Sequence, residues 1–402
     1  MKGLAVEKRI VIIALLTLVG PVLTGCAEKT LELSPPSAIT QFDGQHDTAT
    51  LQSSHDLELF AQYWGPQSKP KGLVLLLHGT TMHSGAYSEV AKYLASEGYL
   101  VYGLDMRGWG RSEGRGAKGF VASHEQYVWD LDMAIHRLKS QYPEEELYVM
   151  GESLGATVAL YGHLKYGVSF DGMVFSGPAF KPNVQLLGLR GPRFMHNISM
   201  ALGAGLGQSL PGLPTLPSDM GIRMVNDDPA MEEKLLNDPH VSHSLLPAAY
   251  LTSLSEALDY IQTNIEGMEL PLMIAHGQRD VLIPVSSSEE LIERAGGDNQ
   301  TLTIYRSNHT TLLGTKRYQV YRDIENWLDQ QEGQSETATE PQTIKAEQLN
   351  LEEAYELGDL HFRNGHYSAA RKYFLTVQEK HPGHVDSLLY LGLAELRMDS
   401  VE

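Results

Sequence analysis

Short apolar runs alternate with amphipathic stretches between residues 49 and 330 of the chain. The clearest run is Gly72-Leu73-Val74-Leu75-Leu76-Leu77, a continuous apolar segment typical of strands buried on both faces of a parallel sheet. Further strands are predicted over residues 57–63, 99–104, 147–150, 172–175, 272–275 and 302–305. Helical periodicity separates them over residues 87–96, 124–139, 154–164, 287–295 and 318–328. Strands that alternate with helices predict an α/β domain whose parallel sheet is covered on both faces.

One stretch inside this domain breaks the alternation. Residues 178–268 are rich in glycine, proline, methionine and leucine, and no further strand of the series is obvious there. Long insertions of this kind form lids over active sites, and active-site loops gather at the carboxyl ends of parallel strands. We therefore predict a cap over residues 178–268.

The amino-terminal segment has the layout of a signal peptide. Lys2, Lys8 and Arg9 precede an apolar run over residues 10–19, which is shorter than the ~20 residues that span a bilayer. A buried amino-terminal helix is the alternative, and the basic flank makes it less favoured. Residues 28–48 lack clear periodicity and are predicted to be a tether.

The motif that follows this apolar run resembles the bacterial lipoprotein signal. It reads Leu23-Thr24-Gly25-Cys26, and in that family cleavage precedes the cysteine, which then receives the lipid. The resemblance implies a signal peptide over residues 1–25 and a lipid-anchored chain that begins with Cys26 and its tether (26–48). Ala27 stands where retention in the inner membrane would require Asp, which favours a location in the cell envelope at the outer membrane, facing the periplasm.

Composition and charge exclude several classes of partner and cofactor. The 31 Lys and Arg residues against 50 Asp and Glu give a net charge of −19, so we expect no binding to nucleic acid, which needs a basic face. Cys26 is the only cysteine, so the chain has no internal disulfide. No Cys/His spacing, P-loop or dinucleotide motif occurs in a suitable context, and we expect neither a metal nor a cofactor.

A candidate nucleophile lies directly after the predicted strand 147–150. The segment reads Gly151-Glu152-Ser153-Leu154-Gly155 and precedes a helical pattern. Strand before and helix after are the context of a nucleophile elbow, in which glycines permit a tight turn and the serine hydroxyl is exposed above the sheet. Serine is a weak nucleophile that needs a base, so Ser153 predicts a partner histidine and a carboxylate that orients it.

The partners are found by their positions after later strands. In the order serine, acid, histidine, Asp280 follows the strand 272–275 and His309 follows the strand 302–305. The earlier loop, Ser176-Gly177-Pro178, offers no carboxylate. We predict Ser153, Asp280 and His309 as the catalytic triad.

The loop after the first buried strand predicts an oxyanion hole. It reads His78-Gly79-Thr80, and the backbone N–H groups of Thr80 and Leu154 are the candidate donors to the developing oxyanion. His78 itself is predicted to brace the loop and take no part in the chemistry.

Three motifs together resemble the monoacylglycerol lipase and lysophospholipase group of serine α/β-hydrolases. They are His78-Gly79 with His83-Ser84-Gly85 and Tyr87, then Asp105-Met106-Arg107-Gly108-Trp109-Gly110-Arg111-Ser112-Glu113-Gly114, then Gly151 to Gly155. The resemblance covers about residues 50–330 and implies an α/β-hydrolase fold with a cap. It departs from many members at Glu152, where they carry His, although plant relatives also show Glu. Asp105 and Arg107 are expected to form an ion pair in this turn.

The resemblance implies a serine carboxylester hydrolase, a lipase or esterase without cofactor, that acts through an acyl-enzyme on single-acyl lipids. Monoacylglycerols and lysophospholipids are the expected substrates. The apolar residues of the cap would cover the acyl chain; these are Met195, Met200, Leu202, Leu206, Leu210, Leu213 and Leu216. A peptidase with the same triad and a non-catalytic scaffold anchored to the membrane are the alternatives.

The carboxyl-terminal segment is separated from the domain by a polar linker over residues 331–347. In residues 348–402, Gly358, Ala370, Phe374 and Pro382 lie at the offsets of a tetratricopeptide repeat, and Leu357-Gly358 recurs after 34 residues as Leu391-Gly392. A plain amphipathic helix pair is the alternative. One repeat and a fraction would leave an apolar face uncovered. We expect a homodimer first, a foreign protein partner second, and docking on the hydrolase domain last.

Overall fold

The computed structural model describes residues 41–183, 224–297, 299–332 and 349–399, together with residues 36, 39, 214–217, 222 and 344. Cys26, the signal segment and most of both linkers lie outside the described residues. Among those described, no helix combines the length and the apolar character that crossing a membrane requires.

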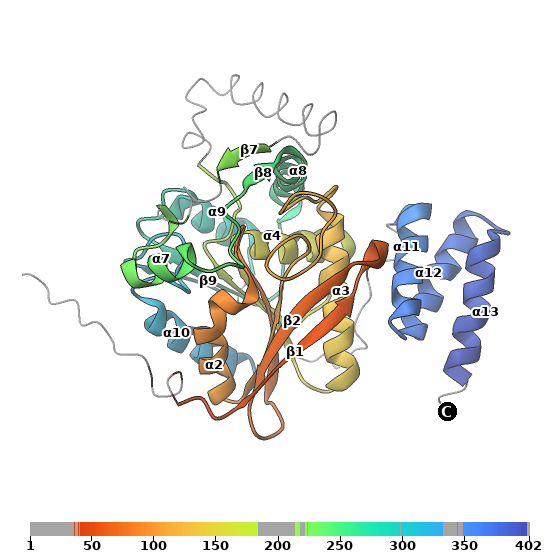
Figure 1. Cartoon of the computed structure of the whole chain (residues 1–402), viewed down its shortest axis with the longest axis horizontal. Helices are drawn as coiled ribbons and strands as arrows, with labels where there is room; N and C mark the ends of the chain where they lie inside the picture. Colours follow the sequence, from red (N-terminus) through yellow and green to blue (C-terminus); the bar gives the residue numbers. More distant parts are fainter. Residues whose placement is uncertain are drawn as a thin grey trace, which may run out of the picture. The chain divides into compact units, whose positions relative to one another are not determined.

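An eight-stranded sheet forms the centre of the hydrolase domain (Figure 1). Its strands lie in the order β1-β2-β4-β3-β5-β6-β9-β10. The strands are β1 (Gln45–Gln52), β2 (Glu58–Gly65), β3 (Gly72–Leu77), β4 (Tyr99–Leu104), β5 (Leu147–Glu152), β6 (Gly172–Ser176), β9 (Leu272–Gly277) and β10 (Gln300–Tyr305). All the strands predicted from the apolar runs are present, and six strands of this sheet, β3, β4, β5, β6, β9 and β10, run parallel.

The sheet is mixed, whereas the alternation predicted a parallel one. Strand β2 is antiparallel to both β1 and β4, and β1 was not among the predicted strands. Its residues are mostly exposed, so it lacks the apolar run that marks the central strands. A connection of five residues, which includes the short 3₁₀ turn η1 (Ser54–Asp56), joins β1 to β2. Such a short link allows only an antiparallel pair.

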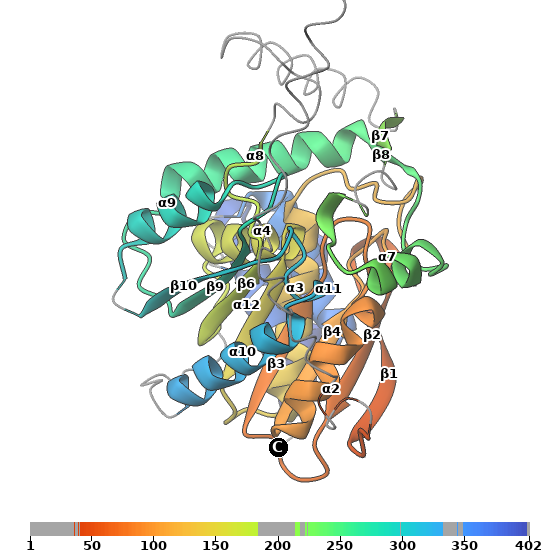
Figure 2. The same cartoon turned by 90° about the vertical axis from the view of Figure 1, so that its left-hand side faces the viewer.

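Helices cover both faces of the sheet, as Figure 2 shows for α2 (Ser88–Ser96) and α10 (Arg317–Gln331) on one face. The other face is covered by α3 (Glu125–Gln141), α4 (Leu154–Tyr161) with the π turn η3 (Gly162–Tyr166), and α9 (Val285–Ala295). Alternate residues of β3 enter the two cores: Leu73, Leu75 and Leu77 pack with α3 and α4, and Val74 and Leu76 with α2 and α10. This division explains why β3 is apolar at every position.

The predicted cap is inserted between β6 and β9. Its described elements are β7 (Pro214–Pro217), α7 (Pro229–Leu236), β8 (Leu245–Pro247) and α8 (Ala248–Asn264). Strands β7 and β8 pair as a separate antiparallel sheet, so the insertion adds no strand to the main sheet. Both views place α8 beside this small sheet (Figures 1 and 2). The cap side chains predicted to cover an acyl chain lie outside the described residues.

Three helices form the carboxyl-terminal segment: α11 (Leu351–Arg363), α12 (Tyr367–Lys380) and α13 (Val385–Asp399). A Cβ atom on Gly358 of α11 would lie 2.7 Å from the ring of Phe374 in α12, so the close approach of the two helices requires glycine at this position. Helix α11 begins with a capping box formed by Asn350 and Glu353.

The prediction that docking on the hydrolase domain would be least favoured is wrong for α11 and α12. Leu357 and Tyr373 are fully buried in the same apolar cluster as Trp129 and Met133 of α3. Ile344, inside the predicted polar linker, is also buried in this cluster, so the end of the linker contributes an apolar contact that its composition concealed.

Candidate active site

Ser153 stands at the tight turn between β5 and α4. Its backbone has φ 49° and ψ −101°, a strained conformation for a residue with a Cβ atom. The two glycines of the motif make the turn possible. A Cβ atom on Gly151 would lie 2.5 Å from the amide nitrogen of Ala156, and one on Gly155 would lie 2.2 Å from the carbonyl oxygen of Leu77. The motif therefore allows helix α4 to pack tightly against the end of β3.

Asp280 and His309 meet at the ends of β9 and β10. The Nδ1–H of His309 donates to Oδ2 of Asp280 over 2.6 Å, and both side chains are buried. This bond leaves Nε2 of His309 as the nitrogen that can accept a proton. Burial lowers the pKa of His309, but the charge and hydrogen bond of Asp280 outweigh burial and raise the pKa above its ordinary value.

The carboxylate of Asp280 is held in its ionised form. Its Oδ1 accepts hydrogen bonds from the backbone N–H groups of Leu282 and Ile283, both at 2.9 Å. Nε2 of His276 lies 3.4 Å from Oδ2. Burial raises the pKa of Asp280, but His309 and these hydrogen bonds together keep the pKa well below its usual range. The sequence did not assign His276 a part in this arrangement.

A short segment at the end of β6 links the serine to the histidine. The backbone N–H of Ser153 donates to the carbonyl of Ser176 over 3.0 Å. The next residue, Gly177, lies against the imidazole of His309, since a Cβ atom there would lie 2.9 Å from Nδ1. With φ 50°, Gly177 also adopts a conformation that favours glycine. The structure thus brings Ser153, His309 and Asp280 to the same edge of the sheet.

The predicted oxyanion donors follow two strands, β3 and β5, that are neighbours in the sheet. Thr80 follows β3, and Leu154 is the first residue of α4, where a backbone N–H has no partner within its own helix. Among the described residues, neither N–H has a hydrogen-bond acceptor. The side chain of Thr80 bonds the hydroxyl of Tyr250 from the cap helix α8 over 2.5 Å. Two backbone donors are thus available at the ends of these neighbouring strands.

Glu152 lies at the centre of a buried hydrogen-bond chain behind the serine, here called the Glu152 network. Tyr87 donates to Oε1 of Glu152 over 2.6 Å and accepts the N–H of Gly79 over 3.1 Å. Ser176 donates to Oε2 over 3.0 Å and contacts the hydroxyl of Thr311 at 2.9 Å. Burial raises the pKa of Glu152 to about 7, although these hydrogen bonds and the charge of His309 oppose it.

This network joins the oxyanion loop, the nucleophile turn and the loop that carries His309. Sequence reasoning had placed Tyr87 in a family motif without a role and had not singled out Ser176 or Thr311. Their contacts depend on segments up to 135 positions apart, which no local pattern signals.

His78 braces the oxyanion loop, as predicted. It is fully buried, and its Nε2 accepts the N–H of Met106 over 2.9 Å, which leaves Nδ1–H to donate to the carbonyl of Gly79 over 2.8 Å. Burial lowers the pKa of His78 to about 4, so the ring is neutral near pH 7. Both of its ring nitrogens are occupied by backbone groups.

The predicted ion pair between Asp105 and Arg107 is wrong. Arg107 instead forms a buried bidentate pair with Asp130 of α3, with both N···O distances at 2.6 Å. Asp105 accepts hydrogen bonds from the backbone N–H groups of Ser84, at 2.7 Å, and Arg111, at 2.9 Å. Asp105 and Arg107 have different partners because the turn after β4 directs their side chains to different elements.

The cap holds the loop that carries His309 from the outside. The backbone N–H of Thr310 donates to the carbonyl of Val225 over 3.0 Å, and Asn226 donates from its side chain to the hydroxyl of Thr310 over 3.1 Å. Arg279, next to Asp280, pairs with Asp227 at 2.6 Å. The cap segment around residues 225–227 therefore positions both loops of the acid–base pair, a role that its sequence did not indicate.

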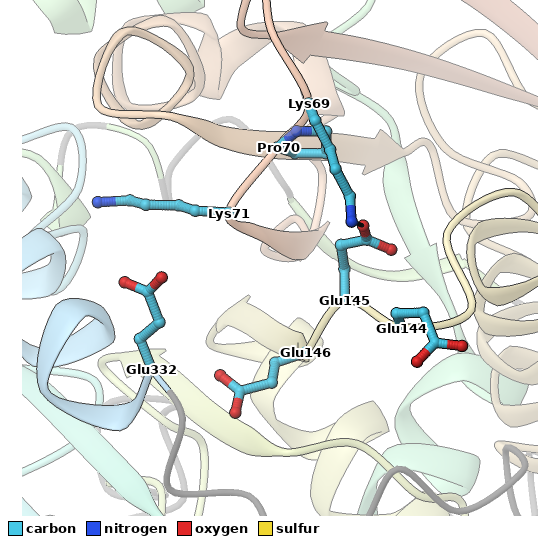
Figure 3. A pocket seen from close by; sticks show the side chains of 7 residues that line it. All are labelled: Lys69, Pro70, Lys71, Glu144, Glu145, Glu146 and Glu332. Atoms are coloured by element: carbon cyan, nitrogen blue, oxygen red, sulfur yellow. Dashed lines mark ion pairs between the residues drawn. The ribbon is translucent and has the colours of Figure 1, made fainter.

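A polar hollow of about 360 Å³ lies away from this site (Figure 3). It is lined by residues that precede β3 and β5 or follow α10, namely Lys69, Pro70, Lys71, Glu144, Glu145, Glu146 and Glu332. Lys69 and Glu145 form an ion pair across it at 2.7 Å. Because Ser153, Asp280 and His309 follow the carboxyl ends of their strands, the hollow is no part of the candidate active site.

Comparison with known proteins agrees with this geometry. The model of the serine aminopeptidase family S33 matches residues 68–313. The monoacylglycerol lipase of Mycolicibacterium smegmatis is 28% identical over 266 residues, which cover 66% of this chain and 90% of that protein. The human monoglyceride lipase is 26% identical over 314 residues, which cover 77% of this chain and 99% of that protein.

Solved structures show the same fold. The crystal structure of Paleococcus ferrophilus monoacylglycerol lipase aligns with a TM-score of 0.59 at 24% identity, covering 68% of this chain and 99% of that one. A soluble variant of monoglyceride lipase from Saccharomyces cerevisiae, solved with a substrate analogue, aligns with a TM-score of 0.60 at 21% identity, covering 72% of this chain and 95% of that one. The chain has the α/β-hydrolase fold and belongs to the serine aminopeptidase S33 family, as a serine hydrolase related to monoglyceride lipases and esterases.

Proposed function

We propose that this hydrolase cleaves the carboxylic ester of single-acyl lipids such as monoacylglycerols or lysophospholipids. The observation that carries the proposal is the similarity to proteins named monoacylglycerol or monoglyceride lipase, which extends over 66–77% of the chain and 90–99% of those relatives. At 26–28% identity the similarity supports the reaction class better than the head group or the chain length. The substrate is therefore the part that most needs measurement.

The proposed mechanism assigns each site residue one task. His309 takes the proton of Ser153 through Nε2 while the serine oxygen attacks the ester carbonyl, and the oxyanion accepts hydrogen bonds from the N–H groups of Thr80 and Leu154. His309 then gives the proton to the leaving alcohol, and an acyl-enzyme remains. Water attacks this ester with His309 again as base, which releases the fatty acid and restores Ser153.

The electrostatics of the site support this assignment. Asp280 stays ionised because its pKa is held low, so it stabilises the imidazolium that forms on His309 when the serine is deprotonated. The same charge raises the pKa of His309 and makes it a stronger base than an isolated histidine. The hydrogen bond between Thr80 and Tyr250 ties the oxyanion loop to the cap, so the position of the loop depends on that of the cap.

A panel of p-nitrophenyl esters and monoacylglycerols of increasing chain length tests the substrate. We expect kcat/KM to rise from acetate toward long acyl chains, and Ser153→Ala to abolish turnover. A preference for acetate or butyrate esters would contradict the proposal of a lipid substrate but would still agree with an esterase. Faster cleavage of aminoacyl p-nitroanilides than of any ester would favour a peptidase.

We propose further that Cys26 carries a lipid that anchors the enzyme to the cell envelope, at the outer membrane. The motif around Cys26 supports this, and two or more acyl chains hold a protein stably where one holds it only marginally. Cys26→Ser should leave the enzyme soluble or unprocessed, with unchanged esterase activity. Retention of this variant in carbonate-washed membranes would show that another feature anchors the chain.

The carboxyl-terminal helices are proposed to be a tetratricopeptide-like unit that pairs with a second copy. Residues of α13 remain exposed after α11 and α12 have docked; they include Val385 (75% exposed), Leu389 (59%) and Leu396 (66%). Two copies would give each the neighbouring repeat that it lacks. Leu389→Glu should convert a dimer to a monomer in light scattering. A wild-type chain that is already monomeric at micromolar concentration would contradict the pairing.

A further inference from the structure

A second cluster of chemically active side chains lies where the carboxyl-terminal helices meet the hydrolase domain. On α3, residues Trp129, Asp132, Met133 and His136 follow the spacing of one helical face. The apolar members pack in the core cluster that contains Leu357 and other residues of α11 and α12. The polar members, Asp132 and His136, lie one helical turn apart on this same face.

His361 of α11 completes a group of three potential metal ligands with Asp132 and His136. One ligand atom from each lies within 4.8 Å of the others. Nε2 of His361 is 2.9 Å from Oδ2 of Asp132, and Nδ1 of His136 is 3.6 Å from the same oxygen and 3.0 Å from the backbone carbonyl oxygen of Asp132. Donor atoms that share a tetrahedral zinc ion lie about 3.3 Å apart, given Zn–N and Zn–O bonds of about 2.0–2.1 Å. The observed separations bracket that value.

A third imidazole stands beside the group. His366, which precedes α12, has its ring centroid 5.3 Å from that of His136 and 5.6 Å from that of His361. Among the described residues, Nδ1 of His361 and Nδ1 of His366 are both buried without a hydrogen-bond partner. Buried nitrogens without partners cost free energy. An ion in this cluster would give Nδ1 of His366 a partner, whereas His361 faces Asp132 through its other nitrogen, Nε2.

The donor set of the cluster suits a cation. Asp132 is fully buried, and its carboxylate faces the imidazoles of His136 and His361. The cluster therefore places one buried carboxylate among imidazoles, which are side chains that bind metals when deprotonated.

We propose that Asp132, His136 and His361 bind a divalent transition metal of the zinc class, with His366 or a water in the fourth position. Imidazole and carboxylate ligands suit zinc better than calcium or magnesium, which prefer oxygen ligands alone. The ion joins α3 of the hydrolase domain to α11, so it acts as a structural clamp between the catalytic domain and the carboxyl-terminal helices.

No local pattern of residues indicated this site, and the expectation of no metal rested on spacing within single segments. Asp132 and His136 are four residues apart, but His361 lies 229 positions after Asp132. Only the docking of α11 on α3 brings them together. The site uses none of the residues assigned to ester hydrolysis, so a result that contradicts one of the two proposals does not contradict the other.

Zinc titration of the full-length chain tests the proposal. The protein is purified in detergent without a histidine tag, stripped with a chelator, dialysed, and titrated with zinc chloride in a calorimeter. We expect one zinc per chain with a Kd below micromolar, weakened at least tenfold by His361→Ala, His136→Gln or Asp132→Asn. His381→Ala, which removes an exposed histidine of the same segment, is the matched control and should bind like the wild type.

Cobalt provides a readout that does not depend on folding energy. Co²⁺ bound by imidazole and carboxylate should give visible absorption bands that disappear in His136→Gln, in which an amide replaces a side chain that is 10% exposed. Circular dichroism checks that each variant keeps its helices. No stoichiometric binding of zinc or cobalt, or binding unchanged in the His136 and His361 variants, would leave a hydrogen-bonded Asp132–His361 contact without metal and overturn the proposal.

Discussion

Replacement of Glu152 by Gln should make the protein more stable at alkaline pH while leaving its packing intact. The amide of Gln has nearly the shape of the carboxyl group. Its oxygen can still accept the hydrogen bond of Tyr87, and its NH₂ can donate to Ser176, which at present donates to Glu152. The only large change is that the variant cannot ionise.

The magnitude follows from the pKa of the buried carboxyl group. In the folded protein this pKa is about 7, against 4.5 for the ordinary group. Between those two values the unfolded chain has released its proton and the folded chain still holds it, so the free energy of unfolding falls by about 1.4 kcal/mol per pH unit. Over 2.5 units the ionisable wild type loses about 3 kcal/mol that Glu152→Gln keeps, and above pH 7 the difference is constant.

Urea unfolding followed by tryptophan fluorescence measures this difference. The chain contains four tryptophans, including the buried Trp64 and Trp109. The free energy of unfolding is determined for the wild type and Glu152→Gln at intervals from pH 4.5 to pH 8.5. Glu233→Gln, which alters an exposed glutamate of α7, is the control and should run parallel to the wild type. Parallel curves for Glu152→Gln as well would refute the reasoning, because they would mean that Glu152 ionises as an exposed carboxyl group does.

Three further substitutions probe the site. Asp280→Asn should lower kcat by about 10⁴-fold. Because this change removes the charge that raises the pKa of His309, the acid limb of the kcat/KM profile should move to lower pH, and an unchanged acid limb would contradict this origin of the pKa shift. Gly155→Ala should destabilise the domain by about 1–3 kcal/mol in thermal unfolding, because the Cβ atom of the alanine would lie 2.2 Å from the carbonyl oxygen of Leu77. A variant as stable as the wild type would show that helix α4 can shift to make room for it. Tyr87→Phe removes the hydroxyl that donates to Glu152, which should lower the free energy of unfolding by about 1–3 kcal/mol. The same hydroxyl accepts the N–H of Gly79 in the oxyanion loop, so kcat should also fall, and full activity would show that the Glu152 network does not affect catalysis.

The parts of the fold that could be predicted are those that local pattern determines. Strand β3 is apolar at every position because both of its faces are buried. The nucleophile turn is marked by two glycines at which an added Cβ atom would collide with the backbone. The positions of Asp280 and His309 followed from counting strands, since the loops after parallel strands share one edge of the sheet. Each of these inferences depends on short segments.

What could not be predicted depends on contacts between distant segments. Val225 of the cap bonds the residue after His309 across 85 positions, and nothing in the composition of the cap marks it. Arg107 was predicted to pair with Asp105 because the two are close in sequence. Its partner is Asp130 of helix α3, with which it forms a bidentate ion pair. The docking of the carboxyl-terminal helices was misjudged for a similar reason, because a polar linker concealed the buried Ile344.

The place at which the cap enters the chain has a consequence for how this enzyme can diversify. Strands β6 and β9 are hydrogen-bonded neighbours, so the insertion leaves the sheet and returns to it at adjacent points. Its ends stay fixed whatever its length or composition, and the entropy of closing a longer loop rises only slowly. Descendants of this gene can therefore exchange most of the insertion, and with it the shape offered to a substrate, as long as they keep the short stretch around Val225 that steadies the histidine loop.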